Sequence, residues 1–206
     1  ALRFREMTPC YEQRHEDMQI WLARNFLNGG ARTKKIRDNG AFFRHDGQHW
    51  VELKRKDFDK YPEFFSMIGG KRVPEGQAGC WSNPGFLKLM VEKHLKLIKE
   101  NDFEIMKTIH ADITQRCECP ECIKNPDPSS RWFEFYGRLA AELHKTYPDV
   151  LFAASAYQEH RSVPKDDIKG ILYVEYCHYN RCYIHKLDNP DCKYNRQSMD
   201  ELRRWQ

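Results

Sequence analysis

The sequence predicts an α/β protein built on a parallel sheet, and within that class a parallel (β/α)8 barrel of the TIM type. Strand-like and helix-like segments alternate along the 206 residues. The strand-like segments are mostly apolar on both faces, as the strands of parallel sheets are. About five or six β/α units are visible, whereas a complete barrel has eight and typically ~250 residues. We therefore expect residues 1–206 to form a single α/β-barrel domain that is incomplete, or a fragment of a longer chain, with a doubly wound sheet as the second choice.

The expected elements follow from the spacing of apolar residues and from residues that begin or end helices. In chain order they are a strand at 2–7, a helix at 12–28, a strand at 49–53, a helix at 84–101, a strand at 104–109, a helix at 132–143, strands at 150–156 and 168–176, and a helix from 198 to 205. The first strand alternates apolar and polar residues. The first helix has apolar residues at helical spacing and ends at Asn28-Gly29-Gly30. Loop-like segments lie at 61–65 and 69–72.

The helix at 84–101 has the strongest signals. Asn83 is a good N-cap, Pro84 fits the first turn, and Leu87 and Met90 begin a continuous apolar face. The strand at 104–109 follows directly and leads the chain to a histidine, an aspartate and three cysteines. This segment therefore connects a well-marked β/α unit to the residues most suited to chemistry.

The later elements depend on similar patterns. The helix at 132–143 is amphipathic and stops before Pro148. The strand at 150–156 has almost no polar residue, so both of its faces should be buried. The helix that opens at Ser198 is cut short at Gln206, and we therefore expect the domain to continue in a longer enzyme chain.

The composition excludes several classes of protein. The formal net charge is +4 and the basic residues are scattered, so we expect no nucleic-acid partner. No run of 18 apolar residues occurs, so we expect no membrane-spanning helix. No Gly-rich phosphate loop follows a strand, and we expect no organic cofactor. Eight cysteines leave the redox compartment open, and the oligomeric state does not follow from the sequence.

Polar residues collect where the expected strands end. In parallel α/β folds the reactive groups gather beyond the carboxyl ends of the strands. The residues at these places are Glu6, Thr8, Cys10, His110, Asp112, Tyr157, Gln158, Glu159, His160, Glu175, His178 and Asn180. Several carboxylates and imidazoles on one rim are what general acid–base chemistry requires.

Each of these residues also has a purely structural interpretation. Asp112 would cap the turn ahead of the cysteines, and Glu175 would be half of a buried ion pair. Glu159 and His160 would be solvated in a polar loop, and His178 and His185 would be hydrogen-bonded structural histidines. Their clustering at strand ends favours a functional site.

The cysteine segment gives a sharper signal. Cys117, Cys119 and Cys122 can direct three sulfurs at one point across the Pro120 turn, and tetrahedral zinc needs four ligands. The candidates for the fourth ligand are Cys177, Cys182, Cys192 and a histidine, and we take Cys182. The sequence leaves three states open, namely a structural zinc site, a disulfide that involves Cys182 or Cys192, and free thiols. A catalytic cysteine is not expected, since a nucleophile needs one activated thiolate.

Several segments together resemble a known family. They are CWSNPGFLKLMVEKHLKLIKEN, HADITQRCECPEC and SSRWFEFYGRLAAELHKTYPDVLFAASAYQEHRSVPKD, with WLARNFLN and KYPEFFSMIGGKR upstream and CYIHKLDNPDCKYN downstream. In this order they are similar to an uncharacterised glycoside-hydrolase-like barrel family that is related to alpha-glucuronidases and catalogued as a domain of unknown function. Two positions depart from the family pattern, with Ala111-Asp112 in place of Asn-Asp and Asn180 where a glutamate is usual.

The resemblance implies a (β/α)8-type barrel, usually the central part of an exported bacterial protein of the periplasm or cell exterior that breaks down polysaccharides. It places Asp112 at the family aspartate ahead of Cys-x-Cys-x-x-Cys, and Lys71 and Arg72 near the sugar-binding rim. The implied partner is a carbohydrate.

The leading hypothesis is a glycoside hydrolase, alpha-glucuronidase-like, acting on a polysaccharide or oligosaccharide that includes uronic acids. In this hypothesis Asp112 is the acid and Glu175 its partner carboxylate. The residues expected to bind substrate are Lys71, Arg72, Trp81, His110, Tyr157 and His178. The alternative is a non-catalytic carbohydrate-binding barrel domain whose cysteine loop holds a structural zinc ion.

Overall fold

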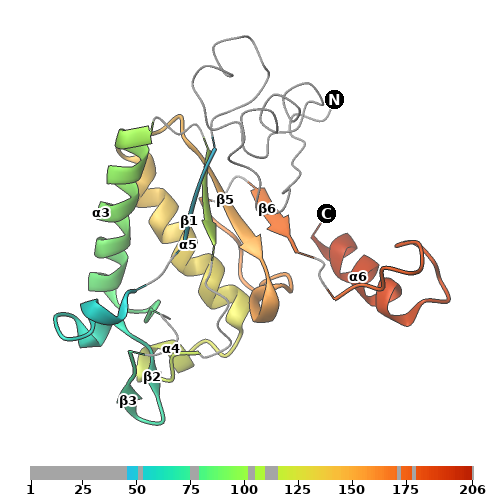
Figure 1. The fold of residues 1–206 in the computed structure, drawn as a ribbon, viewed down its shortest axis with the longest axis horizontal. Helices are drawn as coiled ribbons and strands as arrows, with labels where there is room; N and C mark the ends of the chain where they lie inside the picture. Colours follow the sequence, from blue (N-terminus) through green and yellow to red (C-terminus); the bar gives the residue numbers. More distant parts are fainter. Residues whose placement is uncertain are drawn as a thin grey trace.

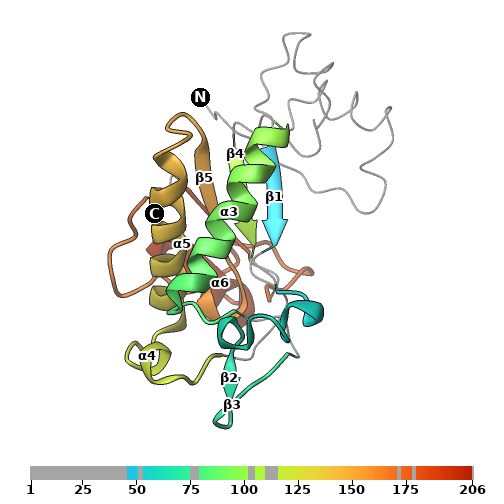
Figure 2. The same cartoon turned by 90° about the vertical axis from the view of Figure 1, so that its left-hand side faces the viewer.

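The computed structural model describes residues 46–50, 53–74, 79–101, 105–109, 116–170, 173–177 and 180–205. Its centre is a parallel sheet of four strands in the order β1-β4-β5-β6, formed by β1 (Asp46–Trp50), β4 (Ile105–Ile109), β5 (Leu151–Ala156) and β6 (Tyr173–Tyr176). In register, Asp46 lies opposite Ile105, and Ile105 lies opposite Leu151. Helices α3 (Pro84–Asn101) and α5 (Pro128–His144) run along one side of the sheet (Figures 1 and 2).

The strand order bears on the fold class. Each described strand of this sheet pairs with the described sheet strand that precedes it in the chain, with no reversal of the kind that defines a doubly wound sheet. The α/β class with a parallel sheet is therefore confirmed. Within the described residues the sheet is small and open, so a complete barrel is not shown.

Helix α3 begins as its sequence predicts. The Asn83 side chain accepts hydrogen bonds from the backbone N–H groups of Gly85 and Phe86, at 2.8 and 3.0 Å, which caps the helix. Phe86 and Met90 on its apolar face are fully buried in the core. The expected bounds of this helix agree with the structure.

Helix α5 forms most of the core between the helices and the sheet. It begins four residues before the expected segment, because Asp127 accepts a hydrogen bond from Ser130 N–H at 2.8 Å and caps it. Trp132 and Tyr136 are fully buried, stack on each other, and donate hydrogen bonds to the carbonyl oxygens of Ser155 and Met106. These bonds tie the helix to β5 and β4.

Below the carboxyl ends of β1 and β4 lie several short elements (Figure 2). They are the 3-10 turns Arg55–Asp57 and Pro62–Phe64, a hairpin of β2 (Met67–Ile68) and β3 (Lys71–Arg72), and α4 (Pro120–Ile123). Gly69 and Gly70 form the hairpin turn with φ of 55° and 78°, a region that glycine occupies without strain. The loop-like segment predicted at 69–72 thus contains the hairpin turn and β3.

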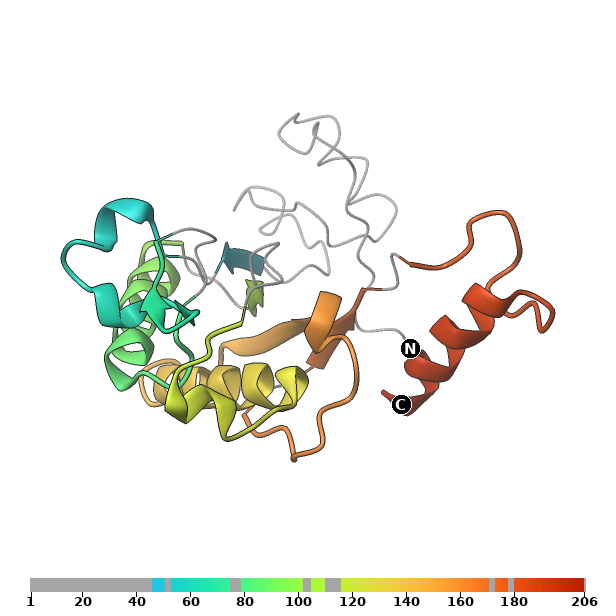
Figure 3. The same cartoon turned by 90° about the horizontal axis from the view of Figure 1, so that it is seen from below.

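The last helix, α6 (Lys193–Arg204), lies beyond β6 (Figures 1 and 3), and Trp205 at its C-terminal end packs on Phe133 of α5. It begins five residues earlier than expected, because its first turn is polar and carries no apolar period. The strand expected at 49–53 is found at 46–50, and β6 starts later than its expected segment. The strand and helix expected at 2–7 and 12–28 lie outside the described residues. Among the helices described, none is long and apolar enough to cross a membrane.

Candidate functional site

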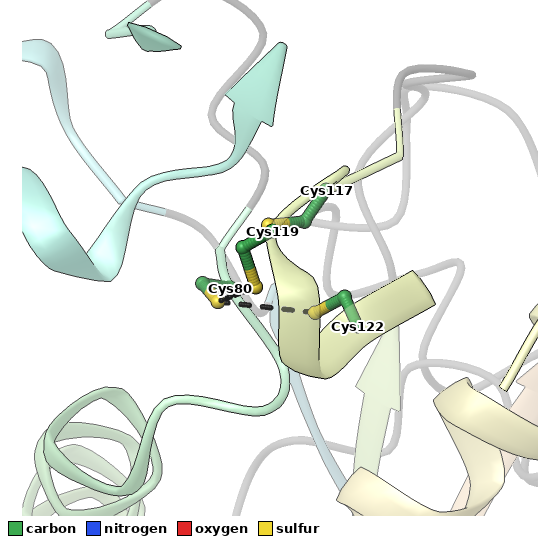
Figure 4. A group of neighbouring side chains, drawn as sticks. All are labelled: Cys80, Cys117, Cys119 and Cys122. Carbon is green, nitrogen blue, oxygen red and sulfur yellow. Dashed lines mark hydrogen bonds between the residues drawn. The ribbon is translucent and has the colours of Figure 1, made fainter. Parts of the chain in front are cut away.

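Four cysteines from two separate segments bring their sulfurs together. They are Cys80, just ahead of α3, and Cys117, Cys119 and Cys122, at and around α4, and all four are buried (Figure 4). The Sγ atom of Cys80 lies 3.6 Å from that of Cys119 and 3.8 Å from that of Cys122. Two sulfurs bound about 2.3 Å from one tetrahedral zinc ion would lie about 3.8 Å apart. The cluster is therefore able to hold a metal ion.

Local structure explains why these sulfurs converge. Cys119 is the N-cap of α4 and Pro120 its first residue, so Cys119 and Cys122 lie one helical turn apart on the same side. Gly79 and Phe65 form an isolated antiparallel bridge, which brings Cys80 beside the hairpin. A Cβ atom at position 79 would come within 2.2 Å of the Phe86 ring, so only glycine fits at this approach.

Hydrogen-bond donors surround the cluster. The Cys117 sulfur accepts from Met67 N–H at 3.3 Å and from the Arg72 guanidinium at 3.7 Å. Hydrogen bonds from Cys117 and Cys122 hold the pKa of the Cys80 thiol well below its usual range. A zinc ion with four thiolates carries a net charge of −2, so a nearby cation and N–H donors would stabilise the loaded site.

The structure differs from the expectation at two of these positions. The fourth sulfur is that of Cys80, whereas Cys182 lies in a second group with His185 and Cys192. Arg72, expected beside a substrate carboxylate, donates to the Phe65 carbonyl at 2.6 Å and to the cysteine cluster. Sequence spacing missed Cys80 because 36 residues separate it from Cys117, and only the chain path through the Phe65–Gly79 bridge brings the two together.

A second feature is a largely buried carboxyl group at the carboxyl end of β5. Glu159 lies in the 3-10 turn Gln158–His160 directly after β5, and its side chain is 9% exposed. Burial raises the pKa of this carboxyl, and the Arg116 guanidinium at 3.7 Å lowers it less than burial raises it. The interpretation of Glu159 and His160 as solvated loop residues is wrong, since His160 is fully buried as well.

Arg116 connects this carboxyl to a pocket. The pocket has a volume of about 480 Å³, and Arg116, Glu118 and Arg131 are its charged lining residues. Arg131 donates to the carbonyl oxygens of Cys117 and Cys122, at 3.3 and 3.1 Å. The two arginines therefore join the pocket to the cysteine cluster on one side and to Glu159 on the other.

Glu175 lies on β6 in register with Ser155 of β5. Phe152, Ala154 and Ala156 of β5 pack in the core with α5, so Ser155 faces the opposite side of the sheet. Because residues paired in register share a face, Glu175 faces that side too. In a closed barrel this side would be the interior, where catalytic carboxylates lie at strand ends.

The remaining expected site residues have different surroundings. Trp81 packs against Trp132 with ring centroids 5.3 Å apart, and Tyr157 follows β5 as the N-cap of the Gln158–His160 turn, half-buried. Lys71 is exposed on β3. Asp112, His110 and His178 lie outside the described residues.

Comparisons with known proteins give a family and a partial structural likeness. Residues 1–206 match a family described as a domain of unknown function, DUF4838. No curated protein matches the chain. Two solved structures of the GH36 alpha-galactosidase AgaA from Geobacillus stearothermophilus are similar, each at 14% identity. The complex with stachyose aligns over 56% of this chain and 17% of its own, with a TM-score of 0.39. The complex with raffinose aligns over 59% and 18%, with a TM-score of 0.41. The chain thus spans less than a fifth of those enzymes.

Proposed function

This chain belongs to the DUF4838 family, and from that premise we propose that it is a glycoside hydrolase acting at the carboxyl edge of its parallel sheet. The observation that carries the proposal is the carboxyl of Glu159, which is largely buried at the end of β5 and has a raised pKa. A carboxyl whose pKa is raised by burial is suited to the role of general acid in glycosidic bond cleavage.

Glu159 donates its proton to the glycosidic oxygen in this proposal. The partner carboxylate is Glu175, which lies on the adjacent strand and on the sheet face that would line a barrel interior. It either attacks the anomeric carbon or activates water, and the separation of the two carboxyls decides between retention and inversion. Asp112, the acid expected from the sequence, is the second candidate for proton donation.

The charges that line the pocket support a substrate class in this proposal. Arg116 and Arg131 outnumber the one acidic lining residue, Glu118. The Nε atom of Arg131 is buried and has no hydrogen-bond partner among the described residues. A sugar carboxylate would accept from such donors, so the proposed substrate is a glycan that carries uronic acids, as an alpha-glucuronidase-like activity requires.

The cysteine cluster has a structural role in this proposal. Zinc held by Cys80, Cys117, Cys119 and Cys122 would fix the segment that carries Arg116, because Arg116 directly precedes Cys117. A bound metal holds a loop far more firmly than turn propensity alone. The zinc ion would thus position one arginine of the pocket without contacting substrate.

The test is hydrolysis of a uronic-acid-bearing xylan compared with the same polymer after reduction of its carboxyl groups. We expect release of acidic sugar from the first polymer and little or none from the second. Glu159→Gln and Glu175→Gln should each reduce turnover at least 100-fold, the scale of general acid–base catalysis. The matched control is Glu134→Gln, which changes an exposed carboxylate on α5.

Other outcomes would contradict particular parts of the proposal. Full activity in Glu159→Gln with loss in Asp112→Asn would move the acid to Asp112. Equal activity on both polymers would remove the role of the arginines. Binding of the glycan by isothermal calorimetry without hydrolysis by the wild-type protein would establish the non-catalytic carbohydrate-binding alternative.

A further inference from the structure

We propose that the chain holds a second zinc ion, separate from the four-cysteine cluster, in a site made by Cys182, His185 and Cys192. The ligand atoms of these three residues lie within 4.8 Å of one another. The Sγ atom of Cys182 is 3.3 Å from Nδ1 of His185. In tetrahedral zinc a sulfur ligand and an imidazole nitrogen lie about 3.6 Å apart, so little movement is needed to admit the ion.

A buried amide holds this loop in the shape that the site requires. Asn195 of α6 is fully buried, and its side chain accepts from Cys182 N–H at 2.7 Å. The same side chain donates to the carbonyl oxygens of His185 and Lys186, at 3.1 and 2.9 Å. The Asn195 side chain therefore fixes the backbone of two of the three ligands, Cys182 and His185. The third ligand, Cys192, is the N-cap of α6, the helix that contains Asn195.

The segment around the site has little apolar burial to keep it folded. Tyr183 and Ile184 are 69% and 91% exposed, and Tyr194 at the start of α6 is 65% exposed. The far end of α6 is anchored, since Trp205 donates to the Arg161 carbonyl and packs on Phe133. A segment without a core of its own commonly depends on a metal or a disulfide, so a metal ion at the near end of α6 would hold this loop in place.

The ligand set favours zinc over a disulfide between Cys182 and Cys192. A disulfide would leave His185 without a role, whereas its Nδ1 atom lies against the Cys182 sulfur. Two thiolates and one imidazole are ligands that zinc prefers, and three protein ligands leave one coordination position for water or another donor. Because His185 is exposed and Cys192 buried, that position lies toward solvent.

The first experiment counts metal in protein purified anaerobically without chelator. We expect two zinc ions per chain in the wild-type protein, one for each group of ligands. His185→Ala and Cys182→Ser should each remove one ion. The matched control is Cys177→Ser, because Cys177 is a half-buried thiol outside both groups and its variant should keep two ions. His185→Ala changes an exposed side chain, so the fold should persist and the count remains interpretable.

Cobalt substitution assigns the lost ion to its site. Of the six thiolate ligands, four belong to the Cys80 cluster and two to this site. His185→Ala should therefore lower the thiolate-to-cobalt absorption by about a third, leaving the spectrum of a four-sulfur site. Loss of two-thirds would place the missing ion in the Cys80 cluster and overturn the proposal. An unchanged metal count in His185→Ala, or a Cys182–Cys192 disulfide found by mass spectrometry, would overturn it too. None of these outcomes depends on glycoside hydrolysis.

Discussion

Substitution of Cys80 by serine tests whether Cys80 is the fourth metal ligand of the four-cysteine cluster. The sequence favours Cys182 as the fourth ligand, whereas the structure places the Cys80 sulfur 3.6 and 3.8 Å from two sulfurs of the cluster. Structural zinc sites bind with apparent free energies of about 10–16 kcal/mol, so one of four ligands accounts for roughly 2.5–4 kcal/mol. Since about 1.4 kcal/mol is a tenfold change, Cys80→Ser should weaken zinc binding on the order of 100-fold or more.

The assay must report on this cluster alone. Alkylation followed by mass spectrometry measures the accessibility of Cys119 and Cys122 with zinc and after chelation. In the wild-type protein zinc should slow alkylation of both thiols, and Cys80→Ser should abolish that protection at zinc concentrations that saturate the wild-type site. Cys182→Ser should leave it intact. Protection lost in Cys182→Ser but retained in Cys80→Ser would refute the proposed ligand set.

Three further predictions concern the fold and the acidic site. Gly137→Ala should lower the free energy of unfolding by about 1–3 kcal/mol in chemical denaturation, because the new methyl would come within 2.4 Å of the Lys169 carbonyl oxygen; unchanged stability would show that the backbone there gives way. Asp127→Ala should lower the free energy of unfolding by about 1 kcal/mol because the N-cap of α5 is lost, while Asp127→Asn should retain most of the stability that this cap provides. For Glu159 the folded pKa lies above the ordinary value of 4.5. The folded state thus keeps a proton that the unfolded state releases, and stability should fall as pH rises from 4.5 through the folded pKa. Glu159→Gln should flatten this part of the pH–stability curve. An unaltered curve would mean that the Glu159 carboxyl ionises at the same pH in the folded and the unfolded state.

The elements that the sequence predicts best are those with local signals. The start of α3 is determined by Asn83 and Pro84, whose effect depends only on the residues that follow them. The apolar strand that becomes β5 is equally local, since its lack of polar residues alone requires burial on both faces. The three clustered cysteines are recognisable as candidate metal ligands for the same reason, because they lie within one turn-helix segment.

The residues that the sequence misplaced depend on contacts between distant segments. The sequence predicts Glu159 to be a solvated loop residue, whereas its side chain is 9% exposed and lies 3.7 Å from Arg116 of a distant segment. The sequence predicts Arg72 to be an exposed cation, whereas the hairpin places its guanidinium beside the cysteine cluster. Neither environment has a signature in the neighbouring residues.

By itself the sequence determined that the chain is an α/β protein with a parallel sheet, where helix α3 begins, and that Cys117, Cys119 and Cys122 lie close together. Only the tertiary structure decided that Cys80 completes this cluster and that Cys182 lies apart with His185 and Cys192. The physical reason is range. Caps, turns and apolar periods act over a few residues, whereas a metal site or a buried carboxyl is made by whichever segments the packed chain brings within a few ångströms.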